Sequence, residues 1–309
     1  IKMNNKKIIF MGTPLVAKEY LEALIKNKID IKAVFTQSPK KQSRGMQLVK
    51  SPVHLLAIEN KIDVYHPIHF DLITISQLKK LEPDLIIVMA YGKLLPKEVL
   101  ELPKNGCINI HVSILPRWRG AAPIEHALMN GDKDTGISII KLIEKLDAGP
   151  IIAQEKMMIP PNFNKAELMK NLTIIGTRLL INSIPKIFTN DFIYQEQDEE
   201  KATYAKKITS EKRKINFNNL TIDIINQIRA HSPKPGAWFY FNNERIKIID
   251  AKPGLAIGKT STILNKNFEI GCSDGSIDPL ILQREGKKII TKDEFLRGFK
   301  FQPNSLIDV

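Results

Sequence analysis

The feature that most constrains this chain is the alternation of short β-branched runs with helical patterns over its first 190 residues. The runs at residues 7–11, 31–35, 85–89, 107–111 and 136–142 predict strands, and the segments at 17–25, 52–59 and 96–100 predict helices. Apolar residues at helical spacing predict a further, long helix that Asn164 caps and that ends near residue 184. Strands that alternate with helices pair in parallel and carry helices on both faces of the sheet. This part of the chain therefore predicts a Rossmann-like, mostly parallel α/β sheet.

The pattern changes after residue 190. Residues 191–200 are acidic and polar, which is typical of a solvated linker. A short helical pattern at 221–230 is followed by strand-like runs at 238–241, 246–249, 262–264, 268–271 and 280–283, with Gly and Asn turns between them. We expect a catalytic domain over residues 1–190, a linker over 191–210 and a smaller OB-like β-barrel domain over 211–309.

Charge and cysteine content narrow the class of protein. The net charge is +13, and residues 201–309 hold 19 Lys and Arg against 11 acidic residues, a net charge of +8. A basic surface attracts polyanions such as RNA, although a lysine-rich, soluble protein has the same composition. Cys107 and Cys272 are far apart, which argues against a disulfide framework or a zinc site and favours a reducing cytoplasm.

Two polar residues share one face of the predicted strand at 107–111. Side chains alternate along a strand, so Asn109 and His111 point to one face while Ile108 and Ile110 point to the other. Open α/β sheets bind ligands at the carboxyl ends of their strands, where both polar residues stand. A hydrogen-bonded structural histidine would produce the same pattern, so spacing alone leaves both interpretations open.

A loop and a distant turn add to this candidate site. Prolines, a glycine and two alanines at residues 112–123 predict an ordered loop, in which Arg117 and Arg119 are expected to be free to meet an anion or an acidic partner. Asp147 lies in a turn before Ala148 and Gly149. An amide, an imidazole and a carboxylate that meet at strand ends could stabilise an oxyanion and move a proton.

These residues carry a resemblance. Asn109-Ile110-His111 together with Asp147-Ala148-Gly149 resembles the signature of the folate-dependent formyltransferases. The run Ser113-Ile114-Leu115-Pro116-Arg117-Trp118-Arg119-Gly120-Ala121-Ala122-Pro123 is similar to that of the members that act on methionyl-tRNA. The likeness extends over nearly the whole chain, from residues 9–14 to residues 203–208. Val112 is a departure, since family members often carry a small residue there, and it predicts a tighter pocket rim.

The resemblance implies a reaction and a set of site residues. The reaction is transfer of the formyl group of 10-formyltetrahydrofolate to the free amino group of initiator methionyl-tRNA, for translation initiation and without a metal. The catalytic residues would be Asn109, His111 and Asp147. The folate-binding residues would be Ser113, Ile114, Leu115, Pro116, Met89, Ala90, Tyr91 and Gly92.

The side-chain types suit this reaction. Formyl transfer to an amine passes through a tetrahedral oxyanion, which the amide N–H of Asn109 can stabilise by roughly 3 kcal/mol. His111 would move a proton between the attacking amine and the leaving nitrogen. Asp147 would favour the charged imidazole or order a water molecule.

Two basic segments are candidates for contact with tRNA. The first is the loop at residues 39–46, where the resemblance implies that Lys40, Lys41 and Arg44 approach the acceptor stem. The second begins with Lys206 and Lys207 and continues over residues 212–214. Contacts to phosphate from such residues would position an RNA, while a solvated charged loop accounts for the same composition.

Alternative functions remain open at this point. A formyltransferase that acts on an amino-sugar nucleotide or another small amine can carry a similar second domain. A catalytically inactive RNA-binding module would not need all three catalytic residues. The basic loop around Arg44 and the basic second domain favour tRNA. We expect a cytoplasmic monomer without a membrane partner, in which the histidines other than His111 are structural and residues 12–14 form a tight strand-to-helix turn.

Overall fold

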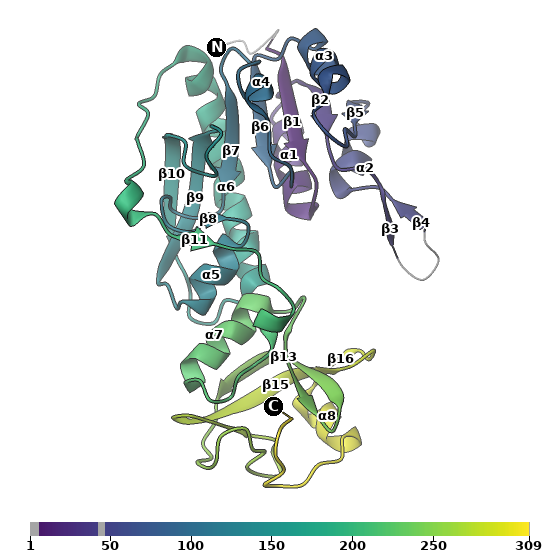
Figure 1. The fold of residues 1–309 in the computed structure, drawn as a ribbon, viewed down its shortest axis with the longest axis vertical. Helices are drawn as coiled ribbons and strands as arrows, with labels where there is room; N and C mark the ends of the chain where they lie inside the picture. Colours follow the sequence, from purple (N-terminus) through teal and green to yellow (C-terminus); the bar gives the residue numbers. More distant parts are fainter. Residues whose placement is uncertain (1–5, 43–46, 309) are drawn as a thin grey trace. The chain divides into compact units, whose positions relative to one another are not determined.

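The computed structural model describes residues 6–42 and 47–308, and their contacts divide the chain into two compact units (Figure 1). Unit 1 comprises Ile1–Arg119, Gly136–Met157 and Asn171–Tyr204, and unit 2 comprises Gly120–Thr135, Met158–Lys170 and Ala205–Val309. The chain crosses between them more than once. Two short segments from the first 190 residues therefore group with the C-terminal part of the chain.

Unit 1 alternates strands and helices, because buried apolar runs are separated by amphipathic segments and by proline or glycine turns. The elements that lie in it wholly or in part are β1 (Ile8–Gly12), α1 (Leu15–Lys26), β2 (Ile31–Phe35), β3 (Lys40–Gln42), β4 (Gln47–Val49), α2 (Pro52–Glu59), β5 (Asp63–Tyr65), α3 (Leu72–Lys80), β6 (Leu85–Met89), α4 (Lys97–Leu100), β7 (Cys107–His111), β8 (Arg119–Gly120), β9 (Asp134–Lys141), β10 (Ile151–Met158), α6 (Lys165–Thr189), the 3-10 turn η1 (Glu199–Lys201) and β11 (Tyr204–Ala205).

The central sheet has seven strands in the order β10-β9-β7-β6-β1-β2-β5. Strands β7, β6, β1, β2 and β5 are parallel, and β9 runs antiparallel to β7. The chain builds the sheet outward from β1 to β2 and later to β6 on the opposite side. Strand order therefore reverses between β1 and β6, and open α/β sheets bind ligands at the carboxyl edge beside such a point. The predicted mostly parallel α/β sheet is confirmed.

The inner strands are continuous apolar runs because both faces of the sheet are covered. Every residue of β1 and of β6 is buried. Helix α1 buries Ala17, Tyr20, Leu21 and Leu24, which recur at helical spacing. At the end of β1, a Cβ on Gly12 would lie 2.9 Å from the Met89 carbonyl oxygen, so this turn requires a glycine.

The long helix α6 begins where its sequence predicts. The Asn164 side chain accepts hydrogen bonds from the N–H groups of Ala166 and Glu167, and the Glu167 carboxylate accepts one from the N–H of Asn164. This reciprocal cap satisfies N–H groups that the first turn leaves without a partner. The helix extends to Thr189, five residues beyond the predicted end at 184. None of the helices among the described residues has the length and apolar content needed to cross a membrane.

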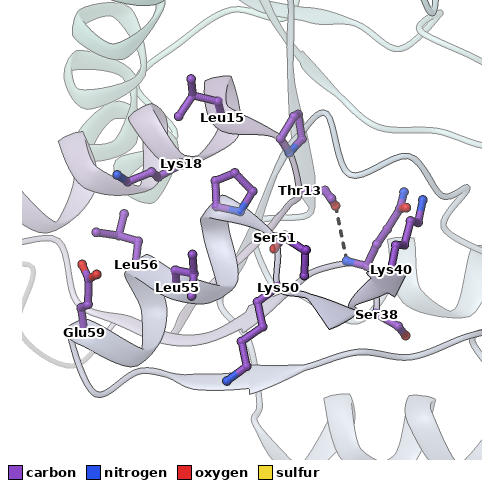
Figure 2. Close-up of a pocket in the computed structure, with 14 residues that line it drawn as sticks. Thr13, Leu15, Lys18, Ser38, Lys40, Lys50, Ser51, Leu55, Leu56 and Glu59 are labelled. Carbon is purple, nitrogen blue, oxygen red and sulfur yellow. Dashed lines mark hydrogen bonds between the residues drawn. The ribbon is translucent and has the colours of Figure 1, made fainter. Parts of the chain in front are cut away.

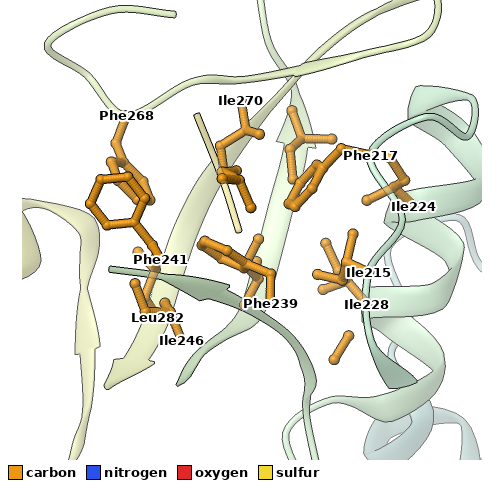
Figure 3. Packing of buried hydrophobic residues seen from close by; sticks show 14 of the residues in the cluster. Ile215, Phe217, Ile224, Ile228, Phe239, Phe241, Ile246, Phe268, Ile270 and Leu282 are labelled. Carbon is orange, nitrogen blue, oxygen red and sulfur yellow. The ribbon is translucent and has the colours of Figure 1, made fainter. Parts of the chain in front are cut away.

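Unit 2 contains a smaller antiparallel sheet in the order β12-β13-β15-β14, with β16 paired to β15. Its elements are α5 (Pro123–Met129), the 3-10 turn η2 (Glu211–Arg213), α7 (Thr221–His231), β12 (Ala237–Phe241), β13 (Glu244–Pro253), β14 (Ile270–Cys272), β15 (Gly275–Arg284), β16 (Ile289–Thr291) and α8 (Lys292–Gly298). The sheet curls around aromatic and aliphatic side chains, which include Phe217, Ile228, Phe239, Phe241, Phe268 and Leu282 (Figure 3). The predicted small β domain is confirmed as a curled half-barrel.

One predicted strand of unit 2 is wrong. Residues 262–264 form only isolated bridges, from Thr262 to Leu306 and from Ile263 to Ile270. The Leu264 N–H donates to the Glu269 carbonyl oxygen and closes a tight turn directly after these residues. The turn leaves too few residues in register for a continuous ladder, although the β-branched side chains favour one.

Candidate active site

The structure brings Asn109, His111 and Asp147 together at the carboxyl edge of the sheet in unit 1. His111 Nδ1 lies 3.5 Å from Asp147 Oδ2, and Asn109 Nδ2 lies 3.5 Å from Asp147 Oδ1. The side chains of His111 and Asp147 are nearly fully buried. The parallel pairing of β6 with β7 sets Val88 opposite Asn109, so the end of β6 adjoins this site. A carboxylate therefore stands between an imidazole and an amide.

The second nitrogen of His111 has a fixed partner. His111 Nε2 lies 2.8 Å from the backbone oxygen of Trp118, in the loop that follows the strand. A carbonyl oxygen can only accept, so Nε2 carries a hydrogen and donates it. Nδ1, on the side of Asp147, is consequently the nitrogen that can gain or lose a proton in this arrangement.

Asp147 is held in an unusual turn. Its φ is +47°, in the left-handed region that favours glycine and costs other residues about 1 kcal/mol or more. Two residues later, a Cβ on Gly149 would lie 1.8 Å from the Lys141 carbonyl oxygen, so only glycine allows the turn to pack against the end of β9. The Asp-Ala-Gly sequence thus serves a backbone conformation that directs the carboxylate inward.

The predicted folate loop at residues 113–116 is rigid and partly buried. Ser113 Oγ donates to the Arg117 carbonyl oxygen at 2.6 Å. Ser138 Oγ, inside β9, accepts from the Leu115 N–H and donates to the Ser113 carbonyl oxygen. Ser113 and Leu115 point into the protein, whereas Ile114 and Pro116 are half-exposed. A ligand can therefore meet Ile114 and Pro116, while the other two residues shape the loop.

Residues 89–92 likewise include two buried residues and two exposed ones. The side chains of Met89 and Tyr91 are buried in the core, and burial raises the pKa of the Tyr91 phenol well above its usual value. Ala90 and Gly92 are exposed and adopt φ values of +47° and +77°. Any ligand contact here falls on Ala90, Gly92 and the backbone between them, and the Tyr91 ring serves packing.

The sequence predicts that Arg119 is free to meet an anion or an acidic partner, and the structure shows that it already pairs with an acidic residue of its own chain. Its guanidinium is fully buried and paired within unit 1. Its Nη1 and Nη2 donate to both carboxylate oxygens of Glu199 at 3.1 and 2.9 Å, and its Nε and Nη2 donate to Gln197 Oε1. These partners lie in the stretch for which composition predicts a solvated linker. The Glu199 side chain is 52% exposed, and composition did not predict that it and Gln197 pair with a buried guanidinium, which requires acceptors.

A cavity of about 610 Å³ opens beside the ends of β1 and β2 (Figure 2). It is lined by Thr13 and Gln37, and three lysines, Lys18, Lys40 and Lys50, contribute to its wall. Thr13 Oγ1 and Gln37 Nε2 both donate to the Tyr91 carbonyl oxygen, at 3.1 and 3.0 Å. The cavity therefore adjoins the 89–92 segment at the point where the strand order reverses, although Asn109, His111 and Asp147 do not line it.

The predicted tRNA-binding residues occupy both units. In unit 1 Lys40 is exposed at the start of β3, Lys41 follows it in the strand, and Arg44 lies outside the described residues. In unit 2 Lys206 and Lys207 are exposed. The exposed lysine side chains, Lys40, Lys206 and Lys207, are thus accessible to a partner.

Three of the remaining histidines match their expected structural role. His66 Nε2 lies 2.6 Å from His54 Nδ1, and the two rings stack. His231 is buried in unit 2, and burial lowers its pKa to about 4.

Sequence reasoning missed four residues that support this site: Ser138, Gln154, Gln197 and Glu199. Gln154 donates to Ser138 Oγ at 2.7 Å and to the Leu115 carbonyl oxygen at 3.0 Å. The one available signal was a polar residue inside the otherwise apolar run of β9. Gln197 and Glu199 gave no signal, because their partner Arg119 lies about 80 residues away in the sequence.

An open α/β sheet that holds an amide, an imidazole and a carboxylate at its carboxyl edge defines a group-transfer enzyme. Comparison with known families agrees with this class. A formyl transferase model matches residues 6–184, and a model of the formyl transferase C-terminal domain matches residues 207–300. The chain belongs to the formyl transferase family.

Individual proteins extend the comparison. Methionyl-tRNA formyltransferase of Pelagibacter ubique is 40% identical over 305 residues, which cover 98% of each chain. The protein of the same name from Wolbachia of Drosophila simulans is 39% identical over 295 residues, covering 95% of this chain and 97% of the relative.

Two solved structures share the fold. HypX from Aquifex aeolicus, in complex with tetrahydrofolic acid, has a TM-score of 0.66 at 18% identity, over 98% of this chain and 50% of HypX. An N-formyltransferase from Helicobacter canadensis, in complex with folinic acid and dTDP-3-aminofucose, has a TM-score of 0.66 at 23% identity, over 90% of this chain and 99% of the other.

Proposed function

We propose that this enzyme transfers the formyl group of 10-formyltetrahydrofolate to the amino group of initiator methionyl-tRNA. The observation that carries the proposal is the assembly of Asn109, His111 and Asp147 at the carboxyl edge of the sheet. Near-full-length identity of 40% with a relative of that activity supports the choice of acceptor over a small amine.

Each member of the trio has a role that its position allows. The amine attacks the formyl carbon, a C–N bond forms, and the Asn109 amide donates to the oxyanion that develops. His111 Nδ1 accepts a proton from the attacking nitrogen and returns it to the leaving nitrogen as the original C–N bond breaks. Asp147 stabilises the imidazolium between these transfers, because its carboxylate is 3.5 Å from Nδ1.

The donor site combines residues 89–92 with the loop at 113–116. Ala90 and Gly92 expose backbone N–H and C=O groups, and the half-exposed Ile114 and Pro116 offer an apolar surface. Flat heterocyclic ligands suit such a mixture, in which backbone groups fix orientation and apolar side chains exclude water. These residues therefore fit a pterin ring.

The basic residues suit a polynucleotide acceptor. Lys18, Lys40 and Lys50 line the cavity beside the reversal of strand order, and residues 201–309 carry a net charge of +8. Such surfaces attract the many phosphates of an RNA more strongly than the two phosphates of a sugar nucleotide. We propose that Lys40, Lys41, Arg44, Lys206 and Lys207 contact the tRNA backbone.

The proposal places the enzyme in the cytoplasm as a monomer. Both cysteines are unpaired and buried, and burial raises their pKa values, to about 12 for Cys107 and about 11 for Cys272. Unpaired thiols suit a reducing compartment. A single chain supplies the whole trio, so the chemistry requires no second copy.

A formylation assay tests the acceptor. Purified protein is given 10-formyltetrahydrofolate with methionyl-tRNA, with the same tRNA without its methionine, or with an amino-sugar nucleotide. We expect formyl transfer to methionyl-tRNA alone, and binding of this tRNA that weakens as salt rises. Efficient formylation of the sugar nucleotide, or tRNA binding that is insensitive to salt, would contradict the proposal.

A further inference from the structure

Residues 197–203 have no assigned part in the chemistry, yet they contact the catalytic site from two directions within unit 1. Gln197 hydrogen bonds to the turn that carries Asp147. Thr203 hydrogen bonds to the loop that holds His111. These two contacts make the segment more than a connection between elements.

Both polar atoms of the Gln197 amide, Nε2 and Oε1, have hydrogen-bond partners. Its Nε2 donates to the carbonyl oxygens of Asp147 and Gly149, at 2.8 and 2.7 Å, and its Oε1 accepts from Nε and Nη2 of Arg119, at 3.0 and 2.9 Å. A flipped amide would set its oxygen against two carbonyls and its N–H groups against a guanidinium. The orientation of this side chain is therefore fixed by chemistry.

These hydrogen bonds act on a strained turn. Asp147 has a φ of +47°, and the two carbonyl groups that Gln197 holds flank Ala148, directly after it. Aspartate adopts this conformation more readily than most residues, and the two hydrogen bonds from Gln197 hold it there against the cost of a positive φ. Relaxation of the turn would rotate the carboxylate away from His111 and Asn109.

Arg119 anchors Gln197. Its buried guanidinium donates hydrogen bonds to both carboxylate oxygens of Glu199, and Lys145 donates to the same carboxylate at 2.6 Å. Hydrogen bonds from Arg119 and then Lys145 lower the pKa of Glu199 to about 2, so this acceptor stays ionised. Gln197 is thus held by a planar, fully charged group that cannot adapt to a different position.

Thr203 acts on the other side of the site. Its Oγ1 accepts from the Trp118 N–H at 2.9 Å, and its carbonyl oxygen accepts from the Arg119 N–H at 2.8 Å. Trp118 itself adopts a φ of +63°, and its carbonyl oxygen receives the hydrogen of His111 Nε2. The same short segment therefore fixes the partners of both His111 and Asp147.

We infer that Gln197 is a positioning residue that aims Asp147 at His111, and that residues 197–203 hold the catalytic site in its working geometry. The inference rests on the proposed function, since it presupposes that Asp147 serves formyl transfer. It gives the predicted linker a specific task. Within that acidic stretch, Glu199 neutralises Arg119.

Gln197→Glu is the sharpest test, because the variant keeps an oxygen for Arg119 but loses both donors to the Asp147 turn. We expect kcat to fall at least about tenfold, while KM for folate and for tRNA changes by less than about twofold. The charged pair with Arg119 should offset part of the repulsion between the new carboxylate oxygen and the two carbonyls, so the melting temperature should fall by only a few degrees. The pH profile of kcat should shift as Asp147 moves relative to His111. Gln195→Ala, an exposed position in the same stretch, is the matched control and should retain kcat.

Different results separate the two proposals. A wild-type protein that does not formylate methionyl-tRNA removes the proposed function and this inference with it. An active wild type with an unimpaired Gln197→Glu variant overturns the inference alone. The inference is also overturned if kcat and the melting temperature fall together while the pH profile of kcat stays unchanged. That pattern indicates a purely structural role. Gln197→Met, which has similar length and no charge, replaces the glutamate variant if the latter does not fold.

Discussion

The carboxyl edge of the sheet in unit 1 and the curled sheet of unit 2 differ in the burial of the charged side chains discussed above. In unit 1, His111, Asp147 and Arg119 are buried and hydrogen-bonded to one another or to the loops around them. In unit 2, aromatic and aliphatic side chains fill the core, while Lys206 and Lys207 extend into solvent. The buried charges of one region contrast with the exposed charges of the other.

The contrast teaches where specific chemistry can occur. Burial of a polar group without a partner costs several kcal/mol, so the partners around His111, Asp147 and Arg119 stabilise these side chains and fix their geometry. Exposed lysines keep their hydration and act mainly through long-range attraction, which is weak for each residue and additive over many. The buried trio can therefore carry out specific chemistry, whereas the exposed lysines of both units can only attract a partner.

The largest expected effect concerns the buried trio. His111→Ala and Asp147→Ala should each lower the rate of formyl transfer at least ~100-fold and leave the fold intact, because proton transfer loses its carrier or its stabilising charge. Steady-state kinetics together with circular dichroism measure both properties. Exposed His69→Ala is the control. Normal formyl transfer by either trio variant would remove the assignment.

The second prediction compares the two partners of one ion pair. Arg119→Met should lower the free energy of unfolding by about 3 kcal/mol, since Gln197 and Glu199 lose the donors around which unit 1 is built. Glu199→Gln should lower it less, because the Glu199 side chain is 52% exposed and the glutamine keeps an oxygen that accepts from Arg119. Chemical denaturation measures both. Equal losses would show that burial does not distinguish the partners.

The third prediction uses the buried titratable group of unit 2. His231 has a pKa of about 4 in the folded protein and ~6.5 when unfolded, so the unfolded state binds the proton first as pH falls. Stability contributed by neutral His231 is complete above pH ~6.5 and should decline by about 2 kcal/mol by pH ~5. Denaturation followed by Trp238 fluorescence at several pH values measures the decline. His231→Leu should flatten it, and an unchanged slope in that variant would refute the prediction.

The smallest effect is expected for the exposed lysines. A Lys206→Ala, Lys207→Ala double variant should weaken tRNA binding only a few-fold near physiological salt. It should reduce the slope of log affinity against log salt by about 1 to 2, because each lysine that neutralises a phosphate displaces roughly one counterion. Lys79→Ala, Lys80→Ala is the matched pair, exposed in the last turn of α3. If both double variants reduce the slope equally, tRNA binding depends on the total charge of the protein and not on where the lysines lie.

Much of the fold was predictable because it depends on local patterns. Strands β2, β6 and β7 begin and end at the predicted residues, since continuous apolar runs of that length fit a covered parallel sheet. The cap at Asn164 was visible from residue type alone. β10 (Ile151–Met158) was missed because it is half-exposed and carries Gln154, Glu155 and Lys156, which obscure its alternation.

The candidate site was predictable only in part. Strand alternation places Asn109 and His111 on one face, but no local rule links them to Asp147, which reaches them through the pairing of β7 with β9. Composition predicts solvated side chains at Gln197 and Glu199, and it cannot show that a buried guanidinium lies opposite them. Contacts between residues about 80 positions apart depend on the whole fold.

The sequence by itself determined the class of the sheet, the strand end that carries the polar pair, and the family of the enzyme, because these follow from residue type and spacing along the chain. Only the tertiary structure decided which residues hold that pair in place. The free energy of a buried charge depends on the groups packed against it, and those groups are chosen by the path of the chain through space.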